Sequence, residues 1–148
     1  VFYRMSIVDD ARIAAAVGTR DRGVAAMHDA TEYGIWGGLH EFAHAANLGL
    51  VVHRDQIVMT PSVKEVCALF QIEPFSSISE GTMIAAVRPH AANEVLQRLT
   101  DHGILASICG EMTESSEGIH VVEAGRRRVL EHPGVDPFWE AFYKALKA

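Results

Sequence analysis

The chain has 148 residues, of which 49% are hydrophobic and 22% charged, a composition that predicts one globular domain and excludes a disordered or collagen-like chain. Its net charge of −6, from 13 basic and 19 acidic residues, argues against sequence-independent binding of nucleic acid, which needs a positive surface. No apolar run approaches the roughly 20 residues of a membrane span, and two isolated cysteines are typical of a reducing cytoplasm rather than of a disulfide framework.

Helices and strands alternate through the first half of the sequence. A helix over 6–17, capped by Ser6, precedes a buried strand at 24–27. Apolar residues spaced by three and four then predict an amphipathic helix over 35–46, which a β-branched strand at 48–52 follows.

The second half continues this alternation. Two of its helices begin at Thr60-Pro61 and Asp136-Pro137, where proline takes the first position of the helix. If the strands predicted at 105–109 and 119–122 pair with each other in antiparallel orientation, the sheet is mixed. Together the elements predict an α/β fold, in which helices cover a mixed sheet of four to five strands. The predicted helices are 61–70, 89–102 and 137–146, and the predicted strands are 83–87, 105–109 and 119–122.

A polar loop, residues 28–34, joins the strand at 24–27 to the following helix. Ligands of open α/β sheets bind at the carboxyl ends of strands, and a helix N-terminus offers free N–H groups that a glycine lets a ligand approach. Asp29 and Glu32 would bind donor groups of a substrate, or face a phosphate through a cation, and His28 suits proton transfer. An alternative reading is structural: Asp29 or Thr31 caps the helix, and Glu32 favours its first turn.

His40-Glu41-Phe42-Ala43-His44 matches the H-E-x-x-H pattern of zinc hydrolases, with Glu65 at the distance of a third ligand. We favour two surface histidines instead. The apolar stripe of this helix faces away from His40 and His44, and a strand separates the motif from Glu65. The sequence therefore predicts no metal site.

The run from Ala25 to Val52 resembles the second domain of the aminoimidazole ribonucleotide (AIR) synthetase superfamily. This superfamily includes the purine-pathway synthetase and the carbamoyl dehydratase of hydrogenase maturation. The pattern Asp29-Ala30-Thr31 followed by a glycine-rich helix start is similar to the family motif, although Tyr33 replaces its usual glycine. Ser79-Glu80-Gly81 before a strand is similar to a second family motif, and the segments 5–11 and 133–139 also resemble family members.

The resemblance implies a three-layer α/β/α domain that closes over a substrate. Family members use ATP and Mg²⁺, held chiefly by an N-terminal domain, to phosphorylate an oxygen, in several cases of an amide type. Asp29, Glu32 and His28 would then be catalytic. Thr31, Gly34, Ser79, Glu80 and Gly81 would bind substrate or phosphate.

No nucleotide-binding motif occurs in the 148 residues, and the sequence begins with Val1 rather than Met, so we expect a single domain cut from a longer enzyme and inactive alone. Its expected partners are an N-terminal ATP-binding domain and a small molecule, and an exposed aromatic stripe on the last helix would favour a homodimer. The alternative is a non-catalytic binding or assembly module in which Tyr33 fills the pocket. Arg126-Arg127-Arg128 is either a phosphate grip or, as we favour, a solvated basic turn.

All of this depends on one expectation: the acidic elbow at 28–34 forms one wall of a cleft, and the opposite wall lies on residues outside this sequence.

Overall fold

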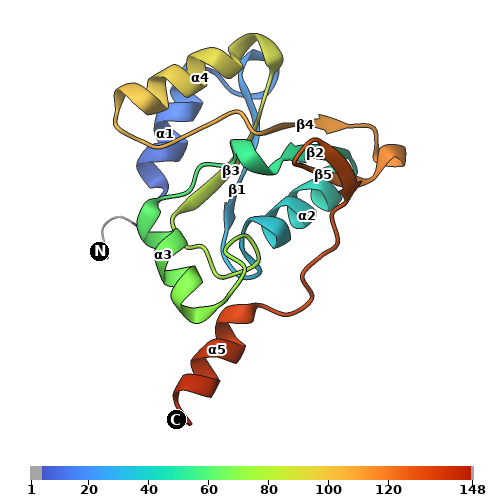
Figure 1. Cartoon of the computed structure of the whole chain (residues 1–148). Coiled ribbons are helices and arrows are strands. Elements are labelled where there is room, and N and C mark those ends of the chain that lie inside the picture. The colour runs from blue at the N-terminus through green and yellow to red at the C-terminus, as the bar shows by residue number, and fades with distance from the viewer. Residues whose placement is uncertain (1–4, 148) are drawn as a thin grey trace.

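The computed structural model describes residues 5–147 (Figure 1), so Val1 lies outside them. Six strands form two sheets. In the first, β1 (Val24–Ala30) pairs antiparallel with β3 (Thr82–Val87). The second has the order β4-β2-β5-β6, built from β4 (Gly110–Thr113), β2 (Gly49–His53), β5 (Ile119–Glu123) and β6 (Arg126–Val129).

The larger sheet confirms the predicted mixed sheet in an α/β fold. β2 runs parallel to β5 and antiparallel to β4, and β5 runs antiparallel to β6. The separate β1–β3 sheet was not predicted. The helices are α1 (Val8–Val17), α2 (Gly34–Ala46), α3 (Pro61–Phe70), α4 (Pro89–Asp101) and α5 (Pro137–Ala145), with short 3-10 turns at Arg20–Arg22, Arg54–Gln56 and Ser115–Glu117.

Two predictions of local structure were wrong. The strand expected at 105–109 lies at 110–113, and it does not pair with β5, because β2 lies between them. The three arginines form β6 rather than a turn: Arg127 and Arg128 pair with Glu117 and Glu123 at 3.6 and 3.4 Å. In both cases the neighbouring strand decided the structure against local sequence preference.

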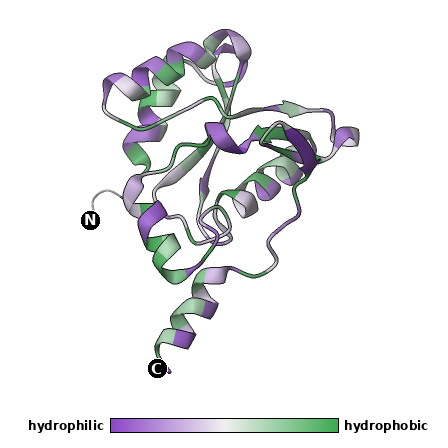
Figure 2. Ribbon diagram, viewed as in Figure 1, coloured by the Kyte–Doolittle hydropathy of each residue, from purple (hydrophilic) through white to green (hydrophobic). Residues whose placement is uncertain are grey.

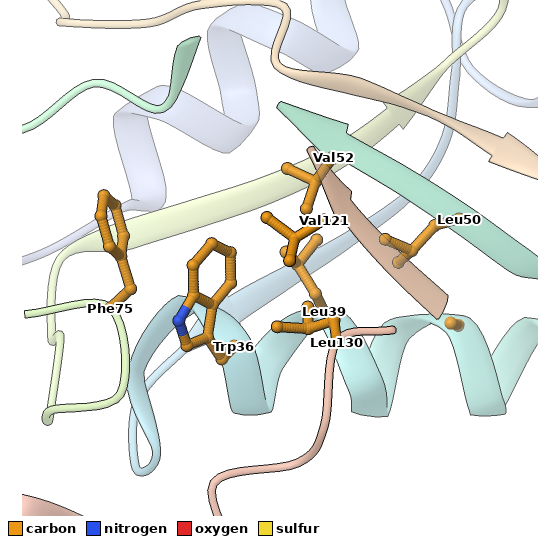
Figure 3. Close-up of a cluster of buried hydrophobic side chains, with 8 residues drawn as sticks. Trp36, Leu39, Leu50, Val52, Phe75, Val121 and Leu130 are labelled. Atoms are coloured by element: carbon orange, nitrogen blue, oxygen red, sulfur yellow. The ribbon is translucent and has the colours of Figure 1, made fainter. Parts of the chain in front are cut away.

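A hydrophobic core joins α2 to the larger sheet (Figure 3). Leu50, Val52 and Val121 project from β2 and β5 toward Leu39 and Trp36 of α2, and Trp36 packs against Phe75 with ring centroids 4.9 Å apart. A second cluster packs α1 and α4 against β1 and contains Ala14, Val24, Val95 and Leu99.

Figure 2 colours hydrophilic residues purple and hydrophobic residues green. Green segments also appear on helices away from these two cores, as on α5. None of the helices among residues 5–147 is long and apolar enough to cross a membrane.

Candidate functional site

The predicted elbow is shorter than the sequence indicated. His28 and Asp29 belong to β1, where they pair with Ile84 and Met83 of β3, so only Thr31–Tyr33 connect the strand to α2. Pairing with β3 extends the strand beyond its apolar residues. Successive side chains of a strand point to opposite faces, so His28 and Asp29 cannot act from the same side.

Ser79 fastens the second predicted motif to the elbow. Its N–H donates to the carbonyl of Thr31 and its hydroxyl to that of Ala30, both at 3.0 Å. Gly81 then turns the chain into β3 with a left-handed backbone (φ +86°), a conformation that glycine adopts at little cost. The structure thus brings Thr31 and Ser79 together, with Glu80 exposed on the same turn.

Gly34 is buried and is required by packing within the chain. Its φ is +61°, and a Cβ there would lie 2.6 Å from the carbonyl oxygens of both Phe75 and Ser77. Its N–H donates to the carbonyl oxygen of Thr31, and the N–H of Trp36, two residues later, donates to the carbonyl oxygen of Phe75 at 2.9 Å. The start of α2 therefore uses these two donors inside the chain.

Tyr33 has a left-handed backbone as well (φ +61°), which costs a residue with a side chain about 1 kcal/mol. A hydrogen bond compensates: the Tyr33 N–H donates to Oδ2 of Asp136 at 2.9 Å. Asp136 is 3% exposed, and its Oδ1 accepts the N–H of Phe138 at the start of α5. Sequence reasoning found Asp136 as a helix start but missed this contact, since nothing local links residues 103 positions apart.

The elbow is open on one side. A hollow of about 280 Å³ lies beside it, lined by Glu32, Tyr33, Gly134, Val135, Asp136 and Trp139. The Tyr33 ring packs against His132, with centroids 5.0 Å apart, and lines this hollow without closing it. Of the elbow, only Glu32 and Tyr33 line this hollow, and its other wall is the start of α5 in the same chain.

Acidic side chains dominate this region. Asp29, Glu32 and Glu80 are exposed. His28 instead lies beside α2, where its Nε2 is 2.8 Å from Oε2 of Glu41 and its ring stacks near Phe42.

His40 and Glu41 of the H-E-x-x-H motif make contacts with other residues of the chain. Nε2 of His40 lies 2.8 Å from the carbonyl oxygen of Leu130, and Glu41 contacts His28. His40 is buried, so its predicted position on the surface was wrong: the segment that follows β6 covers it. Burial lowers the pKa of His40, and His132 and His44 act in the same direction. Within residues 5–147, no three ligating side chains come close enough to hold a metal ion.

Comparisons with known proteins agree on one family. The family model described as "AIR synthase related protein, C-terminal domain" matches residues 1–123. A hydrogenase expression/formation protein of Methanocaldococcus jannaschii is 30% identical over 114 residues, 76% of this chain and 34% of that protein. Carbamoyl dehydratase HypE of Escherichia coli is 33% identical over 118 residues, 78% of this chain and 35% of that protein.

The fold agrees as well. The crystal structure of E. coli HypE superposes with a TM-score of 0.74 at 28% identity, covering 91% of this chain and 41% of that one. The chain thus spans about a third of the length of the curated relatives it matches.

Proposed function

Because the chain belongs to the AIR synthase related family and matches its C-terminal domain, we propose that it is the substrate-side domain of an ATP-dependent enzyme that activates an amide- or carbamoyl-type oxygen of a small molecule. The observation that carries this proposal is the open acidic elbow. Two motifs that are far apart in sequence meet there through Ser79, beside a hollow.

The chemistry follows from the name of the relative. A carbamoyl dehydratase removes water from a carbamoyl group, and the oxygen that leaves is a poor leaving group. ATP with Mg²⁺ would supply the phosphoryl group that lets this oxygen leave as phosphate.

The acidic residues of this chain would orient the substrate. The carboxylates of Asp29 and Glu32 accept hydrogen bonds, so they suit the N–H groups of an amide or carbamoyl group. Holding the reacting group in one orientation is worth a large part of a catalytic effect. Because His28 faces α2 and its Nε2 contacts Glu41, we assign substrate binding to Asp29 and Glu32 instead. Ser79 holds this segment in place through its hydrogen bonds to Ala30 and Thr31, and Glu80 and Gly81 follow it on the same turn.

Mg²⁺ prefers several carboxylate and phosphate oxygens in octahedral geometry. Asp29, Glu32 and Glu80 are suitable single ligands, but no three of the described ligating residues cluster. We therefore propose that Mg²⁺ and ATP are held mainly by an N-terminal domain, and that at most one of these carboxylates completes the site.

The test is ATP-dependent turnover of a carbamoyl compound by these 148 residues joined to whatever sequence the gene encodes before Val1. We expect Asp29→Asn to lower turnover about 100-fold, because an orienting contact is lost. Asp55→Asn, an exposed carboxylate on another face, is the matched control and should have no effect. Unchanged turnover in Asp29→Asn would refute the role of the elbow.

The second candidate is a non-catalytic binding or assembly module. Large apolar side chains that remain exposed on α3 and α5 favour it. The two candidates differ in the same assay, because a module without activity gives no ATP-dependent turnover in any variant while still binding its partner.

A further inference from the structure

The hollow beside the elbow has an aromatic ring on each of its two walls. Tyr33 belongs to the elbow and Trp139 to the first turn of α5, and both side chains line the hollow. The Tyr33 ring packs on His132, whereas the Trp139 ring packs on other rings of α5. Trp139 is 39% exposed and Tyr33 is half-buried, so each keeps surface that a ligand in the hollow can contact.

The two charged side chains that line the hollow are both carboxylates. Glu32 is exposed and Asp136 is 3% exposed, and neither forms an ion pair with any residue in 5–147. Each oxygen of Asp136 accepts one backbone N–H, and the carboxylate offsets the positive end of α5. Glu32 is therefore the negative charge that remains available to a ligand.

The surrounding sequence adds negative charge to the hollow. Segments 28–37 and 129–140 contain all the lining residues and hold five carboxylates, no lysine and no arginine, so their formal charge is −5 with histidine neutral. Charge of one sign around a concave site concentrates ligands of the opposite sign, so the hollow favours a cation over an anion. The five carboxylates are those of Asp29, Glu32, Glu131, Asp136 and Glu140.

The size and lining of the hollow select the kind of cation. No three ligating side chains cluster in the described part of the chain, which disfavours a bare metal ion. The volume of about 280 Å³ suits a group smaller than a drug-sized ligand, whose sites measure about 300–1,000 Å³. A guanidinium group is small and planar, stacks on aromatic rings, and donates two parallel N–H groups to one carboxylate.

We infer that the hollow binds a guanidinium group, which contacts the rings of Tyr33 and Trp139 and donates its N–H groups to Glu32. Every lining residue belongs to this chain, so the site is complete without another domain. The inference goes beyond the proposed enzymatic function and is tested by binding in the absence of ATP. Its failure and the failure of the proposed function are therefore separate results.

Titration of the 148-residue chain with propylguanidinium, followed by NMR of the indole N–H groups, tests this site. The Trp139 signal should shift with a dissociation constant on the order of 1–10 mM, as expected for so small a ligand. The signal of Trp36, which is 5% exposed in the core, should not shift. Propylurea has the same shape without the charge and should bind at least about tenfold more weakly. A pH of 8 keeps histidine side chains such as His132 from adding positive charge.

Three variants test the residues that hold the group. Glu32→Gln should weaken binding about fivefold, because a charged acceptor becomes neutral. Trp139→Leu should weaken it about threefold, measured at the Tyr33 amide, because a cation–π contact is lost. Glu140→Gln removes the same charge from an exposed carboxylate that follows Trp139 but does not line the hollow, so the change should stay below about twofold. An unchanged Trp36 signal shows that each variant is folded.

Comparison with the capped peptide acetyl-Gly-Arg-Gly-amide identifies the source of the guanidinium group. Tighter binding of the peptide than of propylguanidinium indicates an arginine of a protein segment, and equal or weaker binding indicates a free small molecule; both support the inference. Equal affinities for propylguanidinium and propylurea, or equal effects of Glu32→Gln and Glu140→Gln, would overturn it. The absence of any Trp139 shift up to about 50 mM propylguanidinium would overturn it as well.

Discussion

At the scale of single residues, positions 33 and 34 show how the backbone limits the choice of amino acid. Both have a φ of +61°, the conformation that favours glycine. Gly34 has no alternative, since two carbonyl oxygens occupy the space of a side chain. At position 33 the side chain packs against His132 beside the hollow, so a tyrosine fits there in place of the glycine that the resemblance led us to expect.

We expect Gly34→Ala to lower the free energy of unfolding by about 3 kcal/mol, from the left-handed backbone and from overlap with Phe75 and Ser77. Gly125→Ala is the matched control, because its φ is +75° but no atom lies within 4 Å of the added Cβ. The control should cost about 1 kcal/mol. Equal losses in urea denaturation would show that packing around Gly34 is unimportant.

His40 should make stability depend on pH. Its pKa in the folded protein lies below the ordinary value of 6.5, because burial disfavours the charged ring. Below pH 6.5, His40 therefore binds a proton more readily in the unfolded chain than in the folded chain. Because protonation favours the unfolded chain, the free energy of unfolding falls as the pH falls. Above this pH the contribution is constant.

Urea denaturation over a pH series measures this effect. His40→Gln, which retains an N–H donor for Leu130, should lose less stability below pH 6.5 than the wild type does. His90→Gln, at an exposed position on α4, is the control, because it removes a histidine and leaves His40 and its contacts unchanged. Identical pH profiles for wild type and His40→Gln would contradict the assignment.

At the scale of elements, Asp136 connects two parts that are distant in sequence, the elbow and α5. Asp136→Ala removes the cap of α5 and leaves the Tyr33 N–H without its acceptor. We expect a loss of about 2–4 kcal/mol in the free energy of unfolding and faster hydrogen exchange at the Tyr33 amide. Asp101→Ala, whose exposed carboxylate contacts only the Gln97 side chain among the contacts described, should cost under about 0.5 kcal/mol. A similar loss in both variants would argue against the connection.

Periodicity and caps predicted the five helices well, because these signals are local. Helix α1 starts two residues later than predicted, although the Ser6 hydroxyl still accepts the N–H of Val8. Strands were harder, since pairing decides them. The apolar run 105–109 forms no strand, whereas the three arginines at 126–128 do, because β5 lies beside them.

The site was partly predictable for the same reason. The sequence pointed to the elbow and to the turn at Ser79, and the structure brings them together. The wall made by Asp136 and Trp139, and the segment that covers His40, depend on contacts between residues about 90 to 107 positions apart. No local pattern reveals such contacts.

At the scale of the whole molecule, the homodimer expected from the exposed aromatic face of α5 should make thermal stability depend on protein concentration. If the exposed apolar side chains of α3 and α5, among them Leu69 and Tyr143, pack between two copies, mass action stabilises the folded dimer, and the melting temperature rises with protein concentration. Calorimetry over a hundredfold range of concentration measures this. The melting temperature of Leu69→Glu should stay constant over the same range, and a constant value for the wild type would count against the dimer.

The double hydrogen bond of Asp136 has one more consequence. The same buried carboxylate holds the backbone at the mouth of the hollow and the first turn of α5, so these two places cannot reorganise independently. A small molecule that binds in the hollow and restricts the backbone motion of Tyr33 would therefore also restrict the motion of α5. By thermodynamic reciprocity, a partner bound to α5 would raise the affinity for the small molecule by the same factor by which the small molecule raises the affinity for the partner.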